Sequence, residues 1–362
     1  MNVVAYKIIK PIKEGIFNAY SNTMFNMNRR SMQKYKLGCI DPEKALTREQ
    51  KAALRAFWAP YIEIAEHCHT FYTQKTGVFS VKYIPQDVWY LYIDKYYNNM
   101  DESKTLDNKC YYPFLFAGIK QPELILRRMG KFWYEGDQII NETALKARIN
   151  AEPAAFIKEA TESHSGYGVR YISAENGELY TAFCEAIAPM KGDIVVQKPV
   201  KQHAGLSALN ESSVNTYRIL TMLREEGITV YSRVMRMGIG NIKVDNASSG
   251  GVTCGIREDG TLRAVGYKPS GESYTVHPSS GIVFDGYQLP CFDKAVELVK
   301  KAHLMVPHFQ LMAWDITIDE NGEAVMIEAN LTGGELDFHQ LNNGPVFGDD
   351  TEKVLGEVFG KK

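Results

Sequence analysis

Three side chains whose oxygen atoms could bind a metal lie close together in the sequence, in the segment WDITIDENGEAVMIEAN (314–330). They are Asp315, Glu328 and Asn330, with an Asn321-Gly322 pair between them. Asn-Gly flanked by alternating apolar residues predicts a hairpin with a two-residue turn. Counting outward from that turn predicts three cross-strand pairs: Ile318 with Val325, Ile316 with Ile327, and Asp315 with Glu328. Because side chains alternate between the faces of a strand, Asp315, Glu328 and Asn330 should project from one face.

Two carboxylates that face each other across a strand pair repel one another and destabilise it. A sequence that keeps Asp315 opposite Glu328 therefore needs a cation between them. Oxygen ligands without a neighbouring His or Cys suit Mg²⁺, which commonly binds together with substrate phosphates. The alternative interpretation is a solvated polar face, with one acid pointing to water and a one-residue bulge that changes the register.

A glycine-rich loop upstream, SHSGYGV (163–169), could accept phosphates. Small residues let backbone N–H groups approach phosphate oxygens. The loop lies between two expected strands, 154–160 and 169–173, and it matches neither the Walker pattern nor the dinucleotide-binding pattern. A tight hairpin turn is the alternative. The residues of the loop that could cradle a phosphate are Ser163, Ser165, Gly166 and Gly168.

Isolated cations on apolar segments support a polyphosphate site. Lys158 shares a strand face with Phe156 just before the loop, and a charge in that setting needs an anionic partner. Lys109 begins an expected short helix, and Arg218 and Arg236 lie on later strands. A site for a polyphosphate with Mg²⁺ would use several cations and a glycine-rich cover.

Composition limits the class of protein. The chain has 362 residues, 45% of them hydrophobic, which suggests two or three domains. A net charge of −2 gives no sign of a nucleic-acid partner. The six cysteines include no C-x-x-C pair, and this favours a reduced, cytoplasmic compartment. No run of about 18 apolar residues is present, so no transmembrane helix is expected.

The first 36 residues are basic, with seven Lys or Arg against a single acid, Glu14. They lack the apolar core and cleavage site of a signal peptide. Such a segment could rest on an anionic membrane surface. The more ordinary interpretation is a solvated basic helix or a partly ordered arm.

Helices are expected before the central strands. The segment 47–73 should begin at Thr47, which forms a capping box with Gln50, and Pro60 should kink or divide it. The aromatic residues of 79–99 favour packing over ligand stacking. The C-terminal half is rich in strands, with one amphipathic helix over 290–303.

Taken in chain order, these residues resemble the ATP-grasp superfamily. The matching positions are Lys109, Lys158, the glycine-rich loop, Gln197-Lys198-Pro199-Val200, Arg218 or Arg236, and Asp315 with Glu328-x-Asn330. Within it, the chain resembles the sugar-transfer associated ATP-grasp proteins, found near bacterial polysaccharide biosynthesis genes. The segments that carry this narrower likeness are YIPQD, LDNKCYY, SSVNTYRILT, VDNASSGG, WDITIDENG and IEAN. The resemblance runs from about residue 45 to the end.

The resemblance implies an α+β or α/β fold in which two α+β subdomains clasp ATP. We expect a basic arm at 1–45 and a helical, aromatic-rich region at 46–105. The lysines and the glycine-rich loop would lie in a first subdomain at 106–195, and the Mg²⁺ and nucleotide site in a second at 196–362.

The resemblance also implies roles for the site residues. Lys109 and Lys158 would contact the α- and β-phosphates, the 163–168 loop would close over them, and residues 197–200 would present backbone groups to adenine. Asp315, Glu328 and Asn330 would hold one or two Mg²⁺ ions. Arg236 and Asn246 would face the γ-phosphate. Lys198 departs from the family pattern, because many relatives carry Glu there.

Three functions are compatible with this pattern. The first is an ATP-dependent carboxylate-amine ligase that forms an acylphosphate, with a carboxylate or sugar acid and an amine as substrates. The second is a phosphotransferase that acts on a sugar or lipid hydroxyl. The third is a nucleotide-binding accessory protein that docks through its basic arm. Three histidines could serve as acid-base groups, although packing or surface roles are the simpler interpretation: His203, His277 and His339. Residues 331–348 are expected to contribute to the acceptor pocket.

Overall fold

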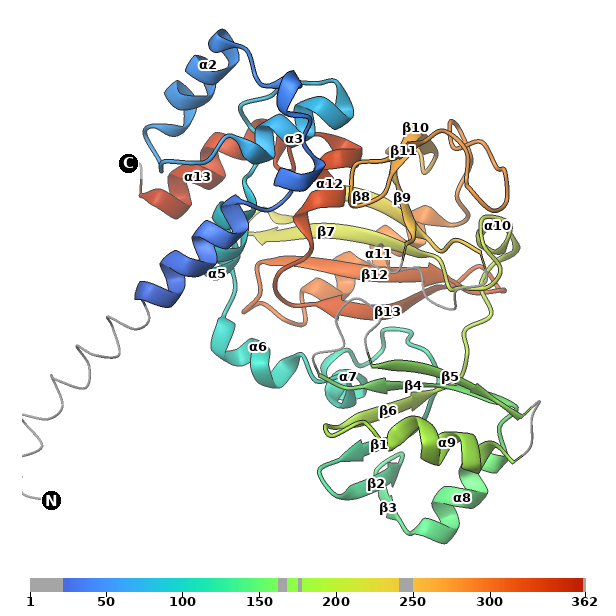
Figure 1. Cartoon of the computed structure of the whole chain (residues 1–362). Coiled ribbons are helices and arrows are strands. Elements are labelled where there is room, and N and C mark those ends of the chain that lie inside the picture. The colour runs from blue at the N-terminus through green and yellow to red at the C-terminus, as the bar shows by residue number, and fades with distance from the viewer. Residues whose placement is uncertain (1–21, 162–167, 175–177, 241–249, 361–362) are drawn as a thin grey trace, which may run out of the picture. The chain divides into compact units, whose positions relative to one another are not determined.

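The computed structural model describes residues 22–161, 168–174, 178–240 and 250–360 (Figure 1). The chain divides into two compact units, Met1–Ile93 with Asp349–Lys362, and Asp94–Gly348. All the predicted site residues belong to the second unit. The four-region division expected from the sequence is drawn on different boundaries and stays a prediction.

The first unit is helical in its described part. Its helices are residues 22–33, η1 (Leu37–Cys39), η2 (Pro42–Lys44), α2 (Arg48–Trp58), α3 (His67–Thr76), α4 (Gln86–Val88), η3 (Trp89–Ile93) and α13 (Thr351–Phe359), with η8 (Gly348–Asp350) at the unit boundary. The predicted capping box of Thr47 and Gln50 is present at the start of α2. This helix ends at Trp58, so Pro60 divides the segment as expected.

Aromatic rings fill the core of the first unit. Trp58, Tyr72 and Tyr83 are each about 1% exposed, and the rings of Tyr72 and Tyr83 stack at 4.7 Å. The basic arm is partly tied to this unit, because Arg29 pairs with the buried Asp87 at 3.1 Å. Contact of the arm with a membrane stays a prediction. Among the described residues, no helix is both long and apolar enough to cross a bilayer.

A six-stranded antiparallel sheet forms one part of the second unit. Its strands are β1 (Leu124–Met129), β2 (Phe132–Glu135), β3 (Gln138–Ile140), β4 (Ala154–Glu159), β5 (Val169–Ser173) and β6 (Ile194–Gln197), in the order β3-β2-β1-β6-β4-β5. Helices α8 (Glu142–Asn150) and α9 (Leu179–Ile187) cover one face (Figure 1). Ile157 and Val196 point into that helix-covered core. Lys158 and Gln197 therefore project from the opposite face.

A seven-stranded antiparallel sheet forms the other part. Its strands are β7 (Thr216–Arg224), β8 (Gly227–Met237), β9 (Val252–Ile256), β10 (Leu262–Tyr267), β11 (Ser273–Tyr274), β12 (Leu311–Ile318) and β13 (Ala324–Asn330), in the order β11-β10-β9-β8-β7-β12-β13. Helix α11 (Phe292–His303) buries its apolar side on one face, where Trp314 and Ile316 also lie. Helix α12 (Leu336–Asn343) packs beside β8, β9 and β10. Asp315 alternates with Trp314 and Ile316, so it lies on the face away from α11.

Short helices flank the six-stranded sheet in the chain. Before β1 come α5 (Asp94–Tyr97), α6 (Met100–Leu106), η4 (Lys109–Tyr111) and α7 (Tyr112–Leu115), and between β6 and β7 lies α10 (Ala204–Ser207). The expected short helix around Lys109 is thus present. Cys110 packs with Ala160 and Val195 of the six-stranded sheet, whereas Tyr112 and Phe116 pack in the core of the seven-stranded sheet.

The β12–β13 hairpin is present, but its predicted turn was wrong. The turn has three residues, because Asp319 pairs with Glu323 and Gly322 adopts φ +78°. Ile318 consequently faces Ala324, and Ile316 faces Met326, in place of the predicted partners.

A register shift between Asp315 and Ile316 then restores the predicted pairing. Ile327 is the extra residue of this bulge, and Asp315 faces Glu328 as expected. The bulge that the alternative interpretation invoked is therefore real. It aligns the two carboxylates instead of separating them.

Candidate functional site

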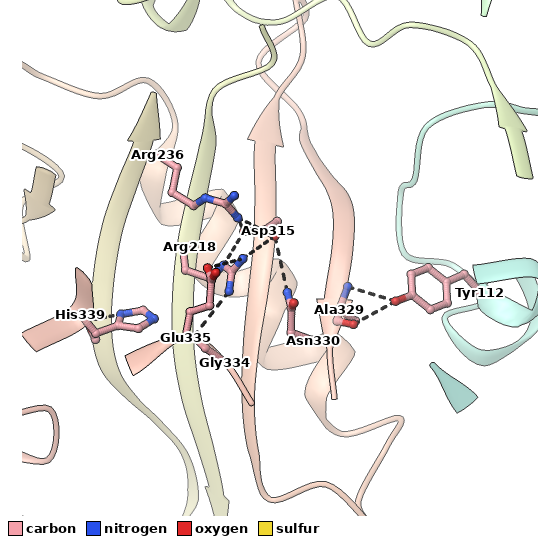
Figure 2. Close-up of polar contacts among 10 residues, drawn as sticks. Tyr112, Arg218, Arg236, Asp315, Ala329, Asn330, Gly334, Glu335 and His339 are labelled. Carbon is pink, nitrogen blue, oxygen red and sulfur yellow. Dashed lines mark hydrogen bonds and ion pairs between the residues drawn. The ribbon is translucent and has the colours of Figure 1, made fainter. Parts of the chain in front are cut away.

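Asp315 occupies the centre of a buried ionic cluster. On β12 it lies opposite Arg218 of β7 on one side and Glu328 of β13 on the other. Arg218 donates to both carboxylate oxygens, Nε to Oδ1 at 2.6 Å and Nη2 to Oδ2 at 3.0 Å. Arg236 of β8 adds Nη1 contacts of 3.0 and 3.1 Å to the same oxygens (Figure 2). All three side chains are at most 5% exposed.

The charges in this cluster compensate one another. Burial acts to raise the pKa of Asp315, but the charges of Arg218 and Arg236 outweigh it and hold the pKa below the ordinary value. Asp315 is therefore ionised at neutral pH. Its two oxygens are occupied by guanidinium N–H groups, so the cation that the sequence analysis required beside Asp315 is supplied by the protein itself.

Glu328 has a different cation. Lys109 Nζ lies 3.0 Å from Glu328 Oε1, and the lysine side chain is 8% exposed whereas the glutamate is 26% exposed. Burial would lower the pKa of Lys109, but the Glu328 carboxylate outweighs this effect and the pKa is raised. A predicted phosphate ligand and a predicted metal ligand are thus paired with each other.

Lys109 reaches Glu328 from a segment that is anchored on the six-stranded sheet. Its own N–H donates to the carbonyl of Ala160, at 2.9 Å. Asn108 Nδ2 donates to Asp193 Oδ2 at 2.7 Å. These bonds hold the start of η4 beside β4 and β6, so the lysine extends from one sheet to the other.

Tyr112 contacts the same strand. Its hydroxyl donates to the carbonyl of Ala329 at 2.9 Å and accepts from the Ala329 N–H at 3.4 Å (Figure 2). Burial first, and then the charges of Asp107 and Glu328, raise the pKa of Tyr112 well above its ordinary value, so the phenol stays protonated. Ala329 lies between Glu328 and Asn330.

The turn after β13 reaches back to Arg218. Gly333, Gly334 and Glu335 have φ of +81°, +63° and +51°, and the last of these is rare for a residue with a side chain. Glu335 Oε2 lies 3.8 Å from Arg218 Nη2, and the Gly334 carbonyl accepts from Arg218 Nη1 at 3.5 Å (Figure 2). The N–H of Gly333 donates to the buried Asp94 at 3.0 Å. This turn opens the 331–348 segment that we expected to line the acceptor pocket.

The three histidines have the packing roles that were the simpler interpretation. His203 caps α10 through its Nδ1, and the ring of His277 contacts the Gly238 carbonyl at 2.9 Å. His339 is fully buried beside Ser232, and burial together with the charge of Arg218 lowers its pKa to about 3. It is therefore neutral in the pH range of enzyme reactions.

A family of proteins described as sugar-transfer associated ATP-grasp matches residues 91–355. The chain belongs to this family. The match includes both sheets and every element of the ionic cluster. Together with the structure, the match confirms the fold expected from the sequence, an ATP-grasp fold of mixed α and β structure with a helical N-terminal region. The structure adds that both sheets are antiparallel.

Several solved structures are similar to the chain at low identity. D-alanine-D-alanine ligase from Bacillus anthracis is 11% identical over 73% of this chain and 70% of that one, with a TM-score of 0.40. N5-carboxyaminoimidazole synthetase from Staphylococcus aureus, complexed with ADP, is 12% identical over 74% of this chain and 55% of that one, with a TM-score of 0.43. This chain thus spans about half of that protein. The ATP-grasp ligase PsnB, complexed with a minimal precursor, is 12% identical. The match covers 72% of this chain and 64% of that one, with a TM-score of 0.40. No curated protein matches the chain.

ATP-grasp proteins bind ATP, and the face of the six-stranded sheet away from α8 and α9 carries groups that suit a nucleotide. Phe156 pairs with Gln197, and Lys158 with Val195, so all four side chains share that face. The Oε1 atom of Gln197 is buried and has no hydrogen-bond partner in the described part of the chain. A purine amino group would satisfy it.

Other predicted nucleotide contacts are engaged within the protein. Lys198 Nζ pairs with Glu123 at 2.6 Å and lies 3.6 Å from Glu152, and its backbone N–H donates to the Glu123 carbonyl. That N–H is thus engaged within the protein, and the expectation that residues 197–200 present backbone groups to adenine stays a prediction. Val200 follows β6 in a half-buried stretch.

The glycine-rich loop can be placed only at its end. Ser163, Ser165 and Gly166 lie outside the described residues, as does Asn246. Gly168 has φ +80°, and a Cβ there would meet Glu159 Oε2 at 2.9 Å. The positive φ therefore favours glycine where the loop rejoins β5.

The oxygen ligands suit Mg²⁺ at two of the three predicted positions. Glu328 and Asn330 share one strand face, and the Asn330 amide N–H group points toward Asp315 Oδ2 at 3.5 Å, which leaves its carbonyl oxygen for a cation. Asp315 would join them only if an arginine released one of its oxygens. The described residues contain no group of three His, Cys, Asp or Glu arranged to hold a metal.

Three residues near the site were not found from the sequence. Tyr112, Asp94 and Glu335 all act through backbone groups or backbone conformation. The Gly-Gly-Glu triplet after IEAN was the available signal for the strained turn. Tyr112 ends the segment LDNKCYY, which carried the family resemblance but gave it no role, and nothing in the residue pattern marked Asp94.

Proposed function

We propose that the chain is an ATP- and Mg²⁺-dependent carboxylate-amine ligase of bacterial polysaccharide or cell-surface glycan modification. The observation that carries this proposal is the ionic cluster on the seven-stranded sheet. Three cations, Lys109, Arg218 and Arg236, converge on two carboxylates that lie opposite each other. In a member of an ATP-grasp family, such a cluster supports phosphoryl transfer from ATP.

Residues of both sheets would bind the nucleotide and the metal. Lys158 and Gln197 on the six-stranded sheet would hold the phosphates and the base. Lys109 would exchange Glu328 for a phosphate oxygen, since both partners are anionic and the lysine remains paired in either state. Arg236 would orient the γ-phosphate from the seven-stranded sheet. Mg²⁺ bound at Glu328 and Asn330 would neutralise phosphate charge.

The proposed reaction balances without a protein nucleophile. A substrate carboxylate oxygen attacks the γ-phosphorus, the bond to the β-phosphate oxygen breaks, and ADP leaves. The amine of the second substrate then attacks the acylphosphate carbon, phosphate leaves, and the amine gives up a proton. Positioning and charge stabilisation supply the catalysis, which fits a site made of cations and a glycine-rich loop.

The test is release of ADP and phosphate in the presence of Mg²⁺ and panels of sugar acids and amines, with product identification by mass spectrometry. Hydroxylamine in place of the amine should give a hydroxamate and report the acylphosphate. Glu328→Gln should reduce turnover by at least about 100-fold, because it removes a charge that acts at the phosphates. Unchanged turnover in Glu328→Gln and in the double variant Asp315→Ala with Glu328→Ala would reject the proposal.

One observation favours a second candidate, a nucleotide-binding accessory protein. Both oxygens of Asp315 accept arginine N–H groups, an arrangement that a purely structural role would also produce. ATP binding without ADP formation on any substrate panel would support this candidate. Loss of lipid binding on deleting residues 1–36 would add the predicted membrane contact. A phosphorylated sugar or lipid without an amide would instead indicate a phosphotransferase.

A further inference from the structure

Within the described residues, strand β13 lies at the edge of its sheet and pairs with β12 alone. Its outer backbone groups therefore need partners from elsewhere in the chain. The N–H of Met326 donates to the Lys120 carbonyl at 2.9 Å. The N–H and C=O of Ala329 are both engaged by the Tyr112 hydroxyl. One phenol thus takes the place of a neighbouring strand at the position between Glu328 and Asn330.

The ring of Tyr112 is fixed independently of its hydroxyl. It is 4% exposed and packs in the apolar core of the seven-stranded sheet. The rings of Tyr112 and Phe116 are nearly perpendicular, at 87°, with centroids 5.3 Å apart, and the centroids of Phe116 and Trp314 are 5.8 Å apart. Removing the hydroxyl alone would therefore leave the ring in place. It would release the backbone of Ala329.

We propose that Tyr112 is a positioning residue that sets the orientation of Glu328 and Asn330 toward a bound divalent cation. The proposal rests on the proposed function to the extent that these two residues hold the metal. Their side chains leave the backbone immediately before and after Ala329, so the angle between them depends on how that peptide is held. The same short segment brings Lys109 to Glu328, and Cys110 and the N–H of Lys109 anchor it on the six-stranded sheet.

Tyr112 would therefore couple the two sheets as well as align the ligands. A group that acts through the backbone of a ligand-bearing strand resembles the outer partners of metal ligands in other sites. Loss of such a partner typically weakens metal affinity by about 10- to 100-fold.

The experiment compares the full chain with Tyr112→Phe. Mn²⁺ is titrated by electron paramagnetic resonance in the presence of ADP, and amide hydrogen exchange is followed by mass spectrometry in peptides covering 324–331 without nucleotide. We expect the Mn²⁺ dissociation constant of Tyr112→Phe to rise about tenfold. Exchange should accelerate in the β13 peptides and stay unchanged in β7.

Two control variants separate positioning from stability. Tyr96→Phe removes a phenol whose residue is 54% exposed and should change neither readout. Val299→Ala opens the core under α11, where the side chain is fully buried, and should lower the unfolding midpoint without changing Mn²⁺ affinity. If Tyr112 were merely structural, Tyr112→Phe would behave like Val299→Ala.

The outcomes also separate this proposal from the proposed function. Mn²⁺ binding by the unchanged chain together with equal affinity in Tyr112→Phe would overturn the positioning role alone. Slow exchange of the β13 peptides in Tyr112→Phe would also overturn it. Failure of the unchanged chain to bind Mn²⁺ with ADP would overturn both the metal-dependent function and the role of Tyr112.

Discussion

The two opposed carboxylates of the site are neutralised in different ways. Asp315 is 4% exposed and is held by two arginines of its own sheet, Arg218 on the neighbouring strand β7 and Arg236 on the next strand, β8. Glu328 is 26% exposed and is held by Lys109, which comes from a segment anchored on the other sheet. We call these the arginine side and the lysine side of the site. The arginine side is part of the sheet, whereas the lysine side is a contact between two sheets.

The difference shows which ion pair can be exchanged when ligands bind. Breaking the arginine side would leave buried charges without compensation, and that is costly in free energy. On the lysine side, Glu328 is 26% exposed and can be hydrated, whereas the buried Lys109 needs another anion in its place. This pair can therefore separate at a smaller cost when an anionic ligand binds. An anionic ligand with a divalent cation would therefore be admitted on the lysine side. The ion pairs of the arginine side would remain unchanged when the ligand binds.

The largest effect that we predict is on the arginine side. Asp315→Asn should lower the free energy of unfolding by about 3–5 kcal/mol, because two buried guanidinium groups lose their counter-charge. Lys109→Met keeps the apolar stem of the lysine and leaves a carboxylate that can be hydrated, so its loss should be about 1 kcal/mol. Urea unfolding of both variants measures the contrast. Similar losses for the two substitutions would contradict the distinction between the sides.

The second prediction concerns pH and the turn that touches the arginine side. Burial raises the pKa of Asp94 to about 6, from an ordinary value of 3.8, although it accepts hydrogen bonds from Gly333 and Asn98. The folded protein therefore binds this proton more tightly than the unfolded chain. The stabilisation from this proton is present below about pH 4 and is lost as pH rises through 6, amounting to about 2 kcal/mol between pH 4.5 and 7.

Asp94→Asn should remove this contribution while keeping an oxygen that can accept from Gly333. The difference in unfolding free energy between the variant and the unchanged chain should shift by about 2 kcal/mol, in favour of the variant, from pH 4.5 to pH 7. Unfolding curves at both pH values provide the measurement. A difference that is constant with pH would show that Asp94 does not titrate in this range.

The smallest predicted effect tests the strained turn itself. Glu335→Gly should stabilise the protein by about 0.5–1 kcal/mol, because φ +51° is readily adopted by glycine. Glu335→Ala removes the same carboxylate but keeps the strain, so it serves as the matched control. A gain in thermal midpoint for both variants would assign the effect to loss of charge beside Arg218. A gain for the glycine variant alone would assign it to the backbone.

The sequence predicted the fold and much of the cluster. The alternation of apolar and polar residues placed Asp315 opposite Glu328, and Lys158 on the same strand face as Phe156. The pairing of Asp315 with Glu328 also depends on a bulge. The turn is one residue longer than Asn-Gly indicated, and the bulge at Ile327 restores the predicted register. Turn length and bulges depend on tertiary packing, which the hydrophobic pattern does not encode.

Pairs between residues far apart in the chain could not be predicted from the sequence, for a related reason. Arg218 and Arg236 were recognised as cations suited to phosphate, but their pairing with Asp315 depends on which strands are neighbours. Lys109 meets Glu328 across more than 200 residues of chain. The Tyr112 hydroxyl binds backbone groups, which every residue carries, so no complementary side chain could have identified its partner.

The coverage of β13 has a consequence beyond the site. The outer edge of a sheet carries unpaired N–H and C=O groups, and these can recruit a strand from another molecule. In β13, the Lys120 carbonyl and the Tyr112 hydroxyl already occupy that edge, at Met326 and Ala329. The strand that bears two proposed metal ligands is thereby also protected from self-association. Release of this edge would expose the protein to aggregation as well as to loss of the site.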